Sequence, residues 1–235
     1  MPIWTPDDAS VVFATQREQT GRFSFYQQSA DGAGDATKLL EAEHSGGNFK
    51  PYVWTPNGEQ LLFDYGPAAA LNIGVLTLGE EQDWQPLLAS EFIEAAPSLS
   101  RDGNWMAYSS TRSGACEIYI ERFPELGSRT RISVSGGTEP LWSPTRDELY
   151  YRQGPNIYAV SINFENGVDA GDPEVIASGI RAPTGCTGRE YDISGDGERF
   201  LVMRQPVAED GSISTMELVL VQNWFEELKR LVPVN

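Results

Sequence analysis

The most regular feature of the sequence is a short unit in which an apolar strand ends at a large side chain, a polar turn follows, and a second apolar strand begins. The clearest copy runs from Val53 to Phe63 and has Thr55-Pro56-Asn57-Gly58 at its centre. Pro and Gly favour the backbone angles of a tight turn, so the unit predicts two antiparallel strands. Five copies occur, each anchored by the apolar residue that ends the first strand: Trp4, Trp54, Leu99, Trp142 and Ile193.

These anchors are separated by 50, 45, 43 and 51 residues. That spacing is typical of a repeat array, and a four-stranded propeller blade needs about 40–50 residues. We therefore predict an all-β fold: a β-propeller of four-stranded antiparallel blades that forms a single domain over residues 1–235. The predicted repeats span about 2–45, 46–90, 91–135, 136–178 and 179–235. A β-sandwich is the alternative, but sandwiches do not repeat one unit five times.

Each of the first four repeats has four segments with the apolar character of short strands. The predicted strands are Pro2–Trp4, Ser10–Thr15, Phe23–Ser29 and Thr37–Leu40; Lys50–Thr55, Glu59–Tyr65, Ile73–Leu78 and Trp84–Leu88; Ala96–Ser100, Trp105–Ser109, Glu117–Phe123 and Thr130–Val134; Glu139–Ser143, Glu148–Gln153, Asn156–Ile162 and Glu174–Ala177; and, in the fifth repeat, Glu190–Ser194, Arg199–Arg204 and Met216–Gln222.

The fifth repeat ends differently from the others. Phe225, Leu228, Leu231 and Val232 recur at helical spacing, which predicts a short C-terminal helix, with an edge strand over Leu228–Val232 as the alternative. Without a fourth strand, the array closes with five blades, forms an open arc of an incomplete six-bladed propeller, or pairs with a second copy. Uncovered blade edges favour self-association through those edges.

The turns resemble those of the TolB-like six-bladed propeller, a WD-repeat-like family with Trp-Ser-Pro-Asp-Gly before an apolar strand. The matching segments are Trp54-Thr55-Pro56-Asn57-Gly58, Trp4-Thr5-Pro6-Asp7-Asp8, Trp142-Ser143-Pro144-Thr145-Arg146 and Ser100-Arg101-Asp102-Gly103. The tail from Glu217 is similar to the end of propeller regions attached to bacterial serine/threonine kinases. The resemblance implies a C-terminal fragment of a larger bacterial regulatory or envelope protein. Because the family also includes periplasmic scaffolds, sensor domains and propellers of prolyl oligopeptidase-like enzymes, it leaves the function open.

Charge and cysteine content narrow the range of partners. The formal net charge is -17, a field that repels nucleic-acid phosphates and anionic membranes. No stretch is long and apolar enough to span a membrane as a helix. Cys116 and Cys186 are the only cysteines and lie in different repeats, so we expect two core residues rather than a disulfide framework. The sequence does not decide between a periplasmic or extracytoplasmic location and a cytoplasmic one.

The sequence offers little for catalysis. It contains no Gly-x-Ser-x-Gly nucleophile elbow, no glycine-rich phosphate loop and a single histidine, His44, which we expect in a solvent-exposed loop. The Asp-Gly pairs lack the ligand spacing of calcium loops, so we expect these carboxylates to cap their own turns. We therefore predict a chain that is not an enzyme and has no cofactor and no metal site.

A binding role would use the axial funnel, where the entry residues of the inner strands lie. These candidate ligand-binding residues are Asn48, Phe49, Lys50, Glu94, Thr138, Glu139, Arg189 and Glu190. Their charges of both signs suit a protein or peptide partner, and a water-filled channel rim is the alternative. We expect a non-catalytic protein- or peptide-binding or sensing module. The alternative is a propeller accessory to a prolyl oligopeptidase-like hydrolase whose catalytic domain is absent from this chain.

Overall fold

The computed structural model describes residues 2–17, 21–42, 47–79, 83–165 and 167–203. The chain divides into two units, Met1–Met203 and Arg204–Asn235, and the fold below is that of the first. All regular secondary structure in the described residues is β-strand. The predicted strand Met216–Gln222, the predicted C-terminal helix and His44 lie outside the described residues. The single-domain division and its repeat boundaries stay predictions.

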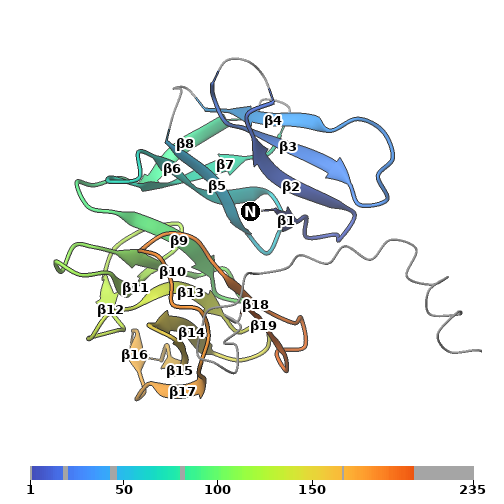
Figure 1. The fold of residues 1–235 in the computed structure, drawn as a ribbon. Helices are drawn as coiled ribbons and strands as arrows, with labels where there is room; N and C mark the ends of the chain where they lie inside the picture. Colours follow the sequence, from blue (N-terminus) through green and yellow to red (C-terminus); the bar gives the residue numbers. More distant parts are fainter. Residues whose placement is uncertain (1, 18–20, 43–46, 80–82, 166, 204–235) are drawn as a thin grey trace, which may run out of the picture. The chain divides into compact units, whose positions relative to one another are not determined.

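The strands form successive antiparallel sheets, here called blades 1 to 5, in chain order (Figure 1). Blade 1 contains β1 (Ile3–Trp4), β2 (Ser10–Thr15), β3 (Ser24–Ser29) and β4 (Thr37–Glu41). Blade 2 contains β5 (Asn48–Trp54), β6 (Gln60–Gly66), β7 (Asn72–Thr77) and β8 (Asp83–Leu88). Blade 3 contains β9 (Glu94–Leu99), β10 (Trp105–Ser110), β11 (Glu117–Arg122) and β12 (Thr130–Arg131).

Blades 4 and 5 depart from four simple strands. Blade 4 contains β13 (Thr138–Trp142), β14 (Glu148–Gln153), β15 (Asn156–Asn163), β16 (Asp169–Ala170) and β17 (Glu174–Ala177). Both β16 and β17 pair with the long β15, so two short segments share the outer edge. The described part of blade 5 is the pair β18 (Tyr191–Ile193) and β19 (Phe200–Val202). The prediction of an all-β fold with four-stranded antiparallel sheets is confirmed, and β16 is the one described strand that the sequence did not predict.

One predicted strand was too long. The sequence predicted a strand to Val134, but β12 ends at Arg131. Ile132 still donates its N–H to the Ile118 carbonyl at 2.8 Å. The N–H of Ile118 then donates to the Ser133 hydroxyl at 2.8 Å, so a side chain takes the place of the next backbone partner.

The turns that join the first two strands share one hydrogen-bond arrangement in blades 1, 2, 3 and 5. In blade 3 the Ser100 hydroxyl donates to the Asp102 carboxylate at 2.6 Å and accepts the N–H of Trp105 at 3.0 Å. Gly103 donates its N–H to the Ser100 carbonyl at 2.8 Å and has a φ of 73°, which glycine adopts at low cost. Thr5, Thr55 and Ser194 make the same contacts in three other blades. The prediction that these carboxylates cap their own turns is thus confirmed for the described Asp-Gly pairs.

The turn sequence also joins neighbouring blades. A Cβ on Gly103 would lie 2.9 Å from Cδ of Pro56 in the preceding blade's turn, and one on Gly58 would lie 3.4 Å from Cγ of Pro6. Because a Cβ at 2.9 Å is a clash, the glycine of one turn leaves room for the proline of the turn before it. The motif therefore encodes packing between blades as well as a reversal of the chain.

The hydrophobic core is divided into four clusters, one between each successive pair of blades. Consecutive residues of one strand contribute to different clusters, because side chains alternate across a strand. Leu61 packs toward blade 1, for example, whereas Leu62 packs toward blade 3. Tyr151 and Tyr150 divide in the same way between blades 3 and 5. Each sheet is thus buried by its neighbours rather than by a second layer.

The expectation for the cysteines was wrong. Cys116 and Cys186 form a disulfide, with their Cα atoms 5.6 Å apart across a sequence separation of 70 residues. The bridge joins the start of β11 to the segment that connects blade 4 with blade 5. The fold brings residues of different repeats together at this point, and their distance along the chain hid the pairing.

Candidate functional site

Four of the five repeat anchors face the preceding blade. Trp54 packs in the cluster between blades 1 and 2, Leu99 between blades 2 and 3, and Trp142 between blades 3 and 4. Ile193 packs toward blade 4. Trp4 occupies the same place in blade 1, yet its side chain is 57% exposed, against 5% for Trp142. Trp54 and Trp142 therefore pack between blades, whereas Trp4 does not.

Blade 5 has a matching exposed face. In blade 4, Leu149 pairs with the anchor Trp142. The next residue, Tyr150, packs toward blade 5. In blade 5, Phe200 pairs with the anchor Ile193, so the next residue, Leu201, is equivalent to Tyr150 of blade 4. Leu201 is 76% exposed. Trp4 and Leu201 are thus side chains that an adjacent blade would bury.

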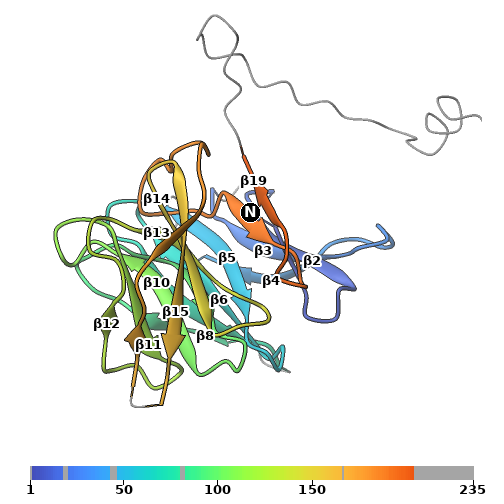
Figure 2. The ribbon, with the colours of Figure 1, turned by 90° about the horizontal axis from the view of Figure 1, so that it is seen from below.

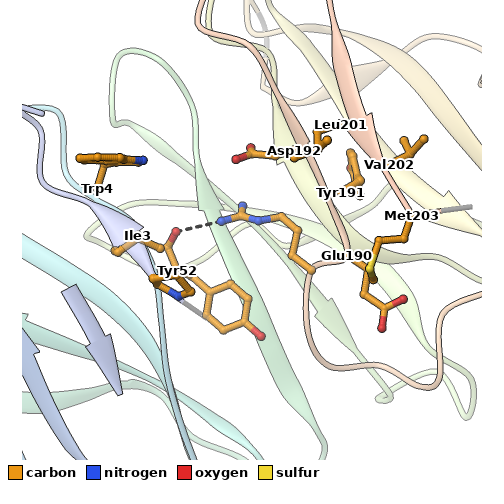
Figure 3. A pocket seen from close by; sticks show the side chains of 11 residues that line it. Ile3, Trp4, Tyr52, Glu190, Tyr191, Asp192, Leu201, Val202 and Met203 are labelled. Carbon is orange, nitrogen blue, oxygen red and sulfur yellow. Dashed lines mark hydrogen bonds between the residues drawn. The ribbon is translucent and has the colours of Figure 1, made fainter. Parts of the chain in front are cut away.

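Between these two faces lies a groove with a volume of about 560 Å³ (Figure 3), within the range of ligand sites in proteins. In Figure 2, β19 lies next to the N-terminal end of the chain, where β1 begins. The groove is lined by Pro2, Ile3, Trp4, Tyr52, Arg189, Glu190, Tyr191, Asp192, Leu201, Val202 and Met203. Most of these side chains are apolar or aromatic.

The floor of the groove is a contact between blade 5 and blade 2. Arg189 donates from Nη2 to the Tyr52 carbonyl at 2.9 Å, and its guanidinium lies 5.7 Å from the Tyr52 ring centre (Figure 3). The N–H of Gly188 donates to the Tyr52 hydroxyl at 3.1 Å. These contacts fix the segment that leads into β18 against the inner strand of blade 2.

A buried carboxyl lies beneath this floor. Asp64 is fully buried and accepts the N–H of Ala96 at 3.0 Å. Burial raises the pKa of Asp64 to about 7, and the Tyr52 hydroxyl, the Ala96 N–H, Lys50 and Arg189 oppose that rise. The positive charge of Arg189 is thus one of the groups that limit the rise in the pKa of Asp64.

A second buried cluster holds blade 5 against blade 4. Nη1 of Arg152 lies 3.5 Å from Oε2 of Glu139 and 3.7 Å from Oε2 of Glu190, and Arg152 is fully buried. Glu190 also donates its N–H to Oε2 of Glu139 at 2.9 Å and forms an ion pair with Arg181. Burial raises the pKa of Glu139, and the Glu190 N–H and Arg152 oppose the rise. The cluster neutralises Glu190, although this residue lines the groove.

The structure places the eight residues predicted at a funnel rim in different environments. Phe49 and Glu94 are inside the fold: Phe49 stacks on Phe25 at 4.2 Å, and Glu94 pairs with Arg112 at 2.9 Å. Thr138 is buried and donates its hydroxyl to the Gly185 carbonyl at 3.3 Å. Asn48 and Lys50 lie in β5, and Glu139 belongs to the buried ion cluster. Arg189 and Glu190 line the groove. The structure thus brings Glu139 and Glu190 together in the ion cluster and places Arg189 beside Glu190 in the groove, and whether any of the eight contacts a ligand stays a prediction.

The sequence did not single out the apolar walls. Trp4 looked like the other anchors, and Leu201, Met203 and Asp192 looked like ordinary strand residues. The signal that could have identified them was the position of their repeats, because the first and fifth repeats each have one neighbour in the array.

No protein-family model matches the chain, and neither does any curated protein sequence. Solved structures do share its fold. A putative TolB from Agrobacterium tumefaciens aligns with a TM-score of 0.66 and 19% identity, covering 87% of this chain and 73% of that one. TolB from Acinetobacter baumannii aligns with a TM-score of 0.62 and 17% identity, covering 85% of this chain and 47% of that one.

A puromycin-hydrolyzing peptidase from Mycobacterium tuberculosis also aligns, with a TM-score of 0.57 and 19% identity, covering 86% of this chain and 34% of that one. The chain therefore spans less than half the length of this peptidase and of the Acinetobacter protein. None of these matches bears on the resemblance of the tail to kinase-attached propellers. Identities this low show the fold alone, and the fold of this chain is that of a TolB-like β-propeller.

Proposed function

We propose that this chain is a non-catalytic binding module that takes a protein or peptide segment into the groove between blades 1 and 5. The observation that carries the proposal is the exposure of Trp4 and Leu201, at positions where the other blades bury their side chains. Burial of large apolar side chains stabilises a complex, and tryptophan is enriched among the residues that dominate binding energy.

The groove differs from the other exposed apolar positions of the described residues. Val134 is 73% exposed and follows the short β12, and the exposed Val175 and Ile176 lie on the outer-edge strand β17. Single exposed apolar side chains are normal on protein surfaces. Around the groove, Trp4, Leu201 and Met203 are exposed together. Such grouped apolar exposure is typical of an interaction site.

The charged residues of the groove support a structural rather than a catalytic role. Arg189 is engaged by Tyr52, and Glu190 is neutralised by Arg152 and Arg181. Hydrolysis by a serine nucleophile requires a base within hydrogen-bond reach of that nucleophile. Neither a serine nor a histidine is among the described residues that line the groove, so we infer binding rather than hydrolysis at this surface.

The disulfide supports a location outside the cytoplasm. Disulfides persist in oxidising compartments and are rare where thiols are kept reduced. The Cys116–Cys186 bridge therefore favours a periplasmic or extracellular setting for the module. Free thiols at both positions in protein isolated under non-reducing conditions would argue against this setting.

A second candidate is a propeller that shapes the active site of a hydrolase. The alignment with the M. tuberculosis peptidase favours it, because that protein extends well beyond the part this chain matches. In this case the catalytic groups would lie in a domain that this chain does not contain. A native reading frame that continues into an α/β-hydrolase would favour the second candidate over the first.

The binding role can be tested by selecting peptides from a displayed random library on the wild-type chain. Each selected peptide is then tested on the Leu201→Glu variant and on Val134→Glu, which places the same charge at another exposed apolar position. We expect peptides that bind the wild type and Val134→Glu but lose about tenfold or more of their affinity for Leu201→Glu. A selection whose peptides bind all three proteins equally would contradict the proposal.

A further inference from the structure

We propose that the partner is cationic as well as apolar: an extended segment that inserts apolar side chains between Trp4 and Leu201 and pairs a lysine or arginine with Asp192. This inference rests on the proposed function and specifies the chemistry of its ligand. It is argued from the charges of the groove, taken one at a time.

Among the described residues that line the groove, three are charged, and two of these three have partners within the fold. Arg189 is held by Tyr52: its Nη2 donates to the Tyr52 carbonyl at 2.9 Å, and its guanidinium lies 5.7 Å from the Tyr52 ring centre. Glu190 is paired with Arg181 and lies 3.7 Å from Arg152. Neither charge is therefore available to select a partner.

Asp192 is the charge that remains. Its side chain is exposed, and its carboxylate accepts the N–H of Ile193 at 2.9 Å. Among the described residues no cation lies within ion-pair distance of it. In Figure 3 Asp192 lies on the same side of the groove as Leu201, and its carboxylate points toward the side of Trp4. A cation that reaches Asp192 would therefore bring its neighbouring apolar side chains between the two walls.

The charge of the whole chain favours the same kind of partner. A net charge of -17 attracts cationic segments and raises the rate at which they associate. A second copy of this chain would bring the same negative charge to the groove, so long-range electrostatics disfavour it as the occupant. The complementary ligand is basic and apolar.

The test uses four fluorescently labelled ten-residue peptides that differ only in composition. The first alternates leucine with lysine; the second replaces each lysine with glutamate, the third replaces each lysine with glutamine, and the fourth replaces each leucine with serine. Affinities are measured by fluorescence anisotropy at physiological salt. We expect the leucine–lysine peptide to bind at least about tenfold more tightly than the glutamate and serine peptides.

Matched variants locate the contacts. Asp192→Asn should weaken the leucine–lysine peptide about two- to fivefold, the range of an exposed ion pair, and leave the leucine–glutamine peptide unchanged. The control Asp35→Asn removes one negative charge at an exposed loop position and should change neither. Leu201→Glu should abolish binding of the leucine–glutamine peptide, whereas Val134→Glu should not.

The outcomes separate this inference from the proposed function. If the lysine, glutamine and glutamate peptides bind equally well and all require Leu201, the groove binds peptides but the cationic preference is wrong. If the leucine–lysine peptide binds Leu201→Glu as well as it binds Val134→Glu, the contact is diffuse charge attraction, and the inference is overturned. If no peptide in the set or in the library selection depends on Leu201, the proposed function itself fails.

Discussion

The boundary between blades 3 and 4 and the boundary between blades 5 and 1 each have a tryptophan at the equivalent position of the repeat. This tryptophan is buried at the first boundary and exposed at the second. At the first, Trp142 is 5% exposed within a cluster that also contains Trp105 and Tyr151. At the second, Trp4 stands at the equivalent place of its repeat and is 57% exposed. The repeat motif therefore determines where a side chain points, and the neighbouring blade determines whether it is buried.

This difference separates stability from binding within one architecture. The four filled boundaries supply the hydrophobic core, because each blade covers its neighbour. The groove between blades 5 and 1 has the same kind of walls without a cluster between them. A substitution at a filled boundary should therefore lower the stability of the fold, whereas the equivalent substitution at the groove should change stability little.

The largest expected effect comes from the same substitution at both tryptophans. Trp142→Ala removes a buried indole and leaves a cavity, so the free energy of unfolding should fall by about 3–5 kcal/mol. Trp4→Ala removes a side chain that is mostly in solvent and should change it by less than about 1 kcal/mol. Urea unfolding followed by circular dichroism measures both. Equal losses of unfolding free energy in the two variants would contradict this difference between the two boundaries.

The next effect concerns the buried ion cluster that holds blade 5 in place. Arg152→Met leaves Glu139 without its cation and Glu190 with Arg181 alone, and should cost about 3–5 kcal/mol of unfolding free energy. Arg199→Met is the matched control, because its side chain is 80% exposed and lies 3.8 Å from Asp196. That control should cost less than about 1 kcal/mol. Similar losses at Arg152 and Arg199 would show that the cluster does not hold blade 5.

The disulfide should have a somewhat smaller effect. Cys116→Ser with Cys186→Ser removes a cross-link over 70 residues and should lower the free energy of unfolding by about 2–5 kcal/mol. The wild type in reductant should approach the stability of the double variant. Mass spectrometry of the unreduced protein checks whether the bridge forms, and two free thiols would contradict its presence.

The smallest effect is the pH dependence of Asp64. Its pKa is about 7 in the fold and near 3.8 when unfolded, so the folded state binds the extra proton between these values. Stability from this group is therefore fully present below about pH 4 and is lost as pH rises through 7. Relative to wild type, Asp64→Asn should gain on the order of a few kcal/mol between pH 5 and pH 8.

The control for this titration is Asp7→Asn. The Thr5 hydroxyl and the Ala9 N–H hold the pKa of Asp7 below its usual value. Its contribution is thus already complete at pH 5 and should not change up to pH 8. Urea unfolding at the two pH values measures both variants, and an unchanged difference between wild type and Asp64→Asn would contradict the raised pKa.

Local features were predictable because neighbouring residues determine them. The turn at Ser100 and its Asp102 cap depend on residues a few positions apart, and the strand pairs follow from alternation. The exposure of Trp4 was not predictable from its own repeat, because burial depends on what packs against the blade. The same reason hid the Cys116–Cys186 pairing and the burial of Glu94, whose partners Ser90 and Arg112 depend on how the strands pair.

The most direct measurement is covalent oxidation of tryptophan in the folded chain, followed by peptide mapping, with and without the leucine–lysine peptide. In the free protein, Trp4 should be modified much faster than Trp142 and Trp54, because its indole is exposed in the groove. The bound peptide should slow the modification of Trp4 alone. A Trp4 that reacts as slowly as Trp142 in the free protein would contradict an open groove between blades 1 and 5.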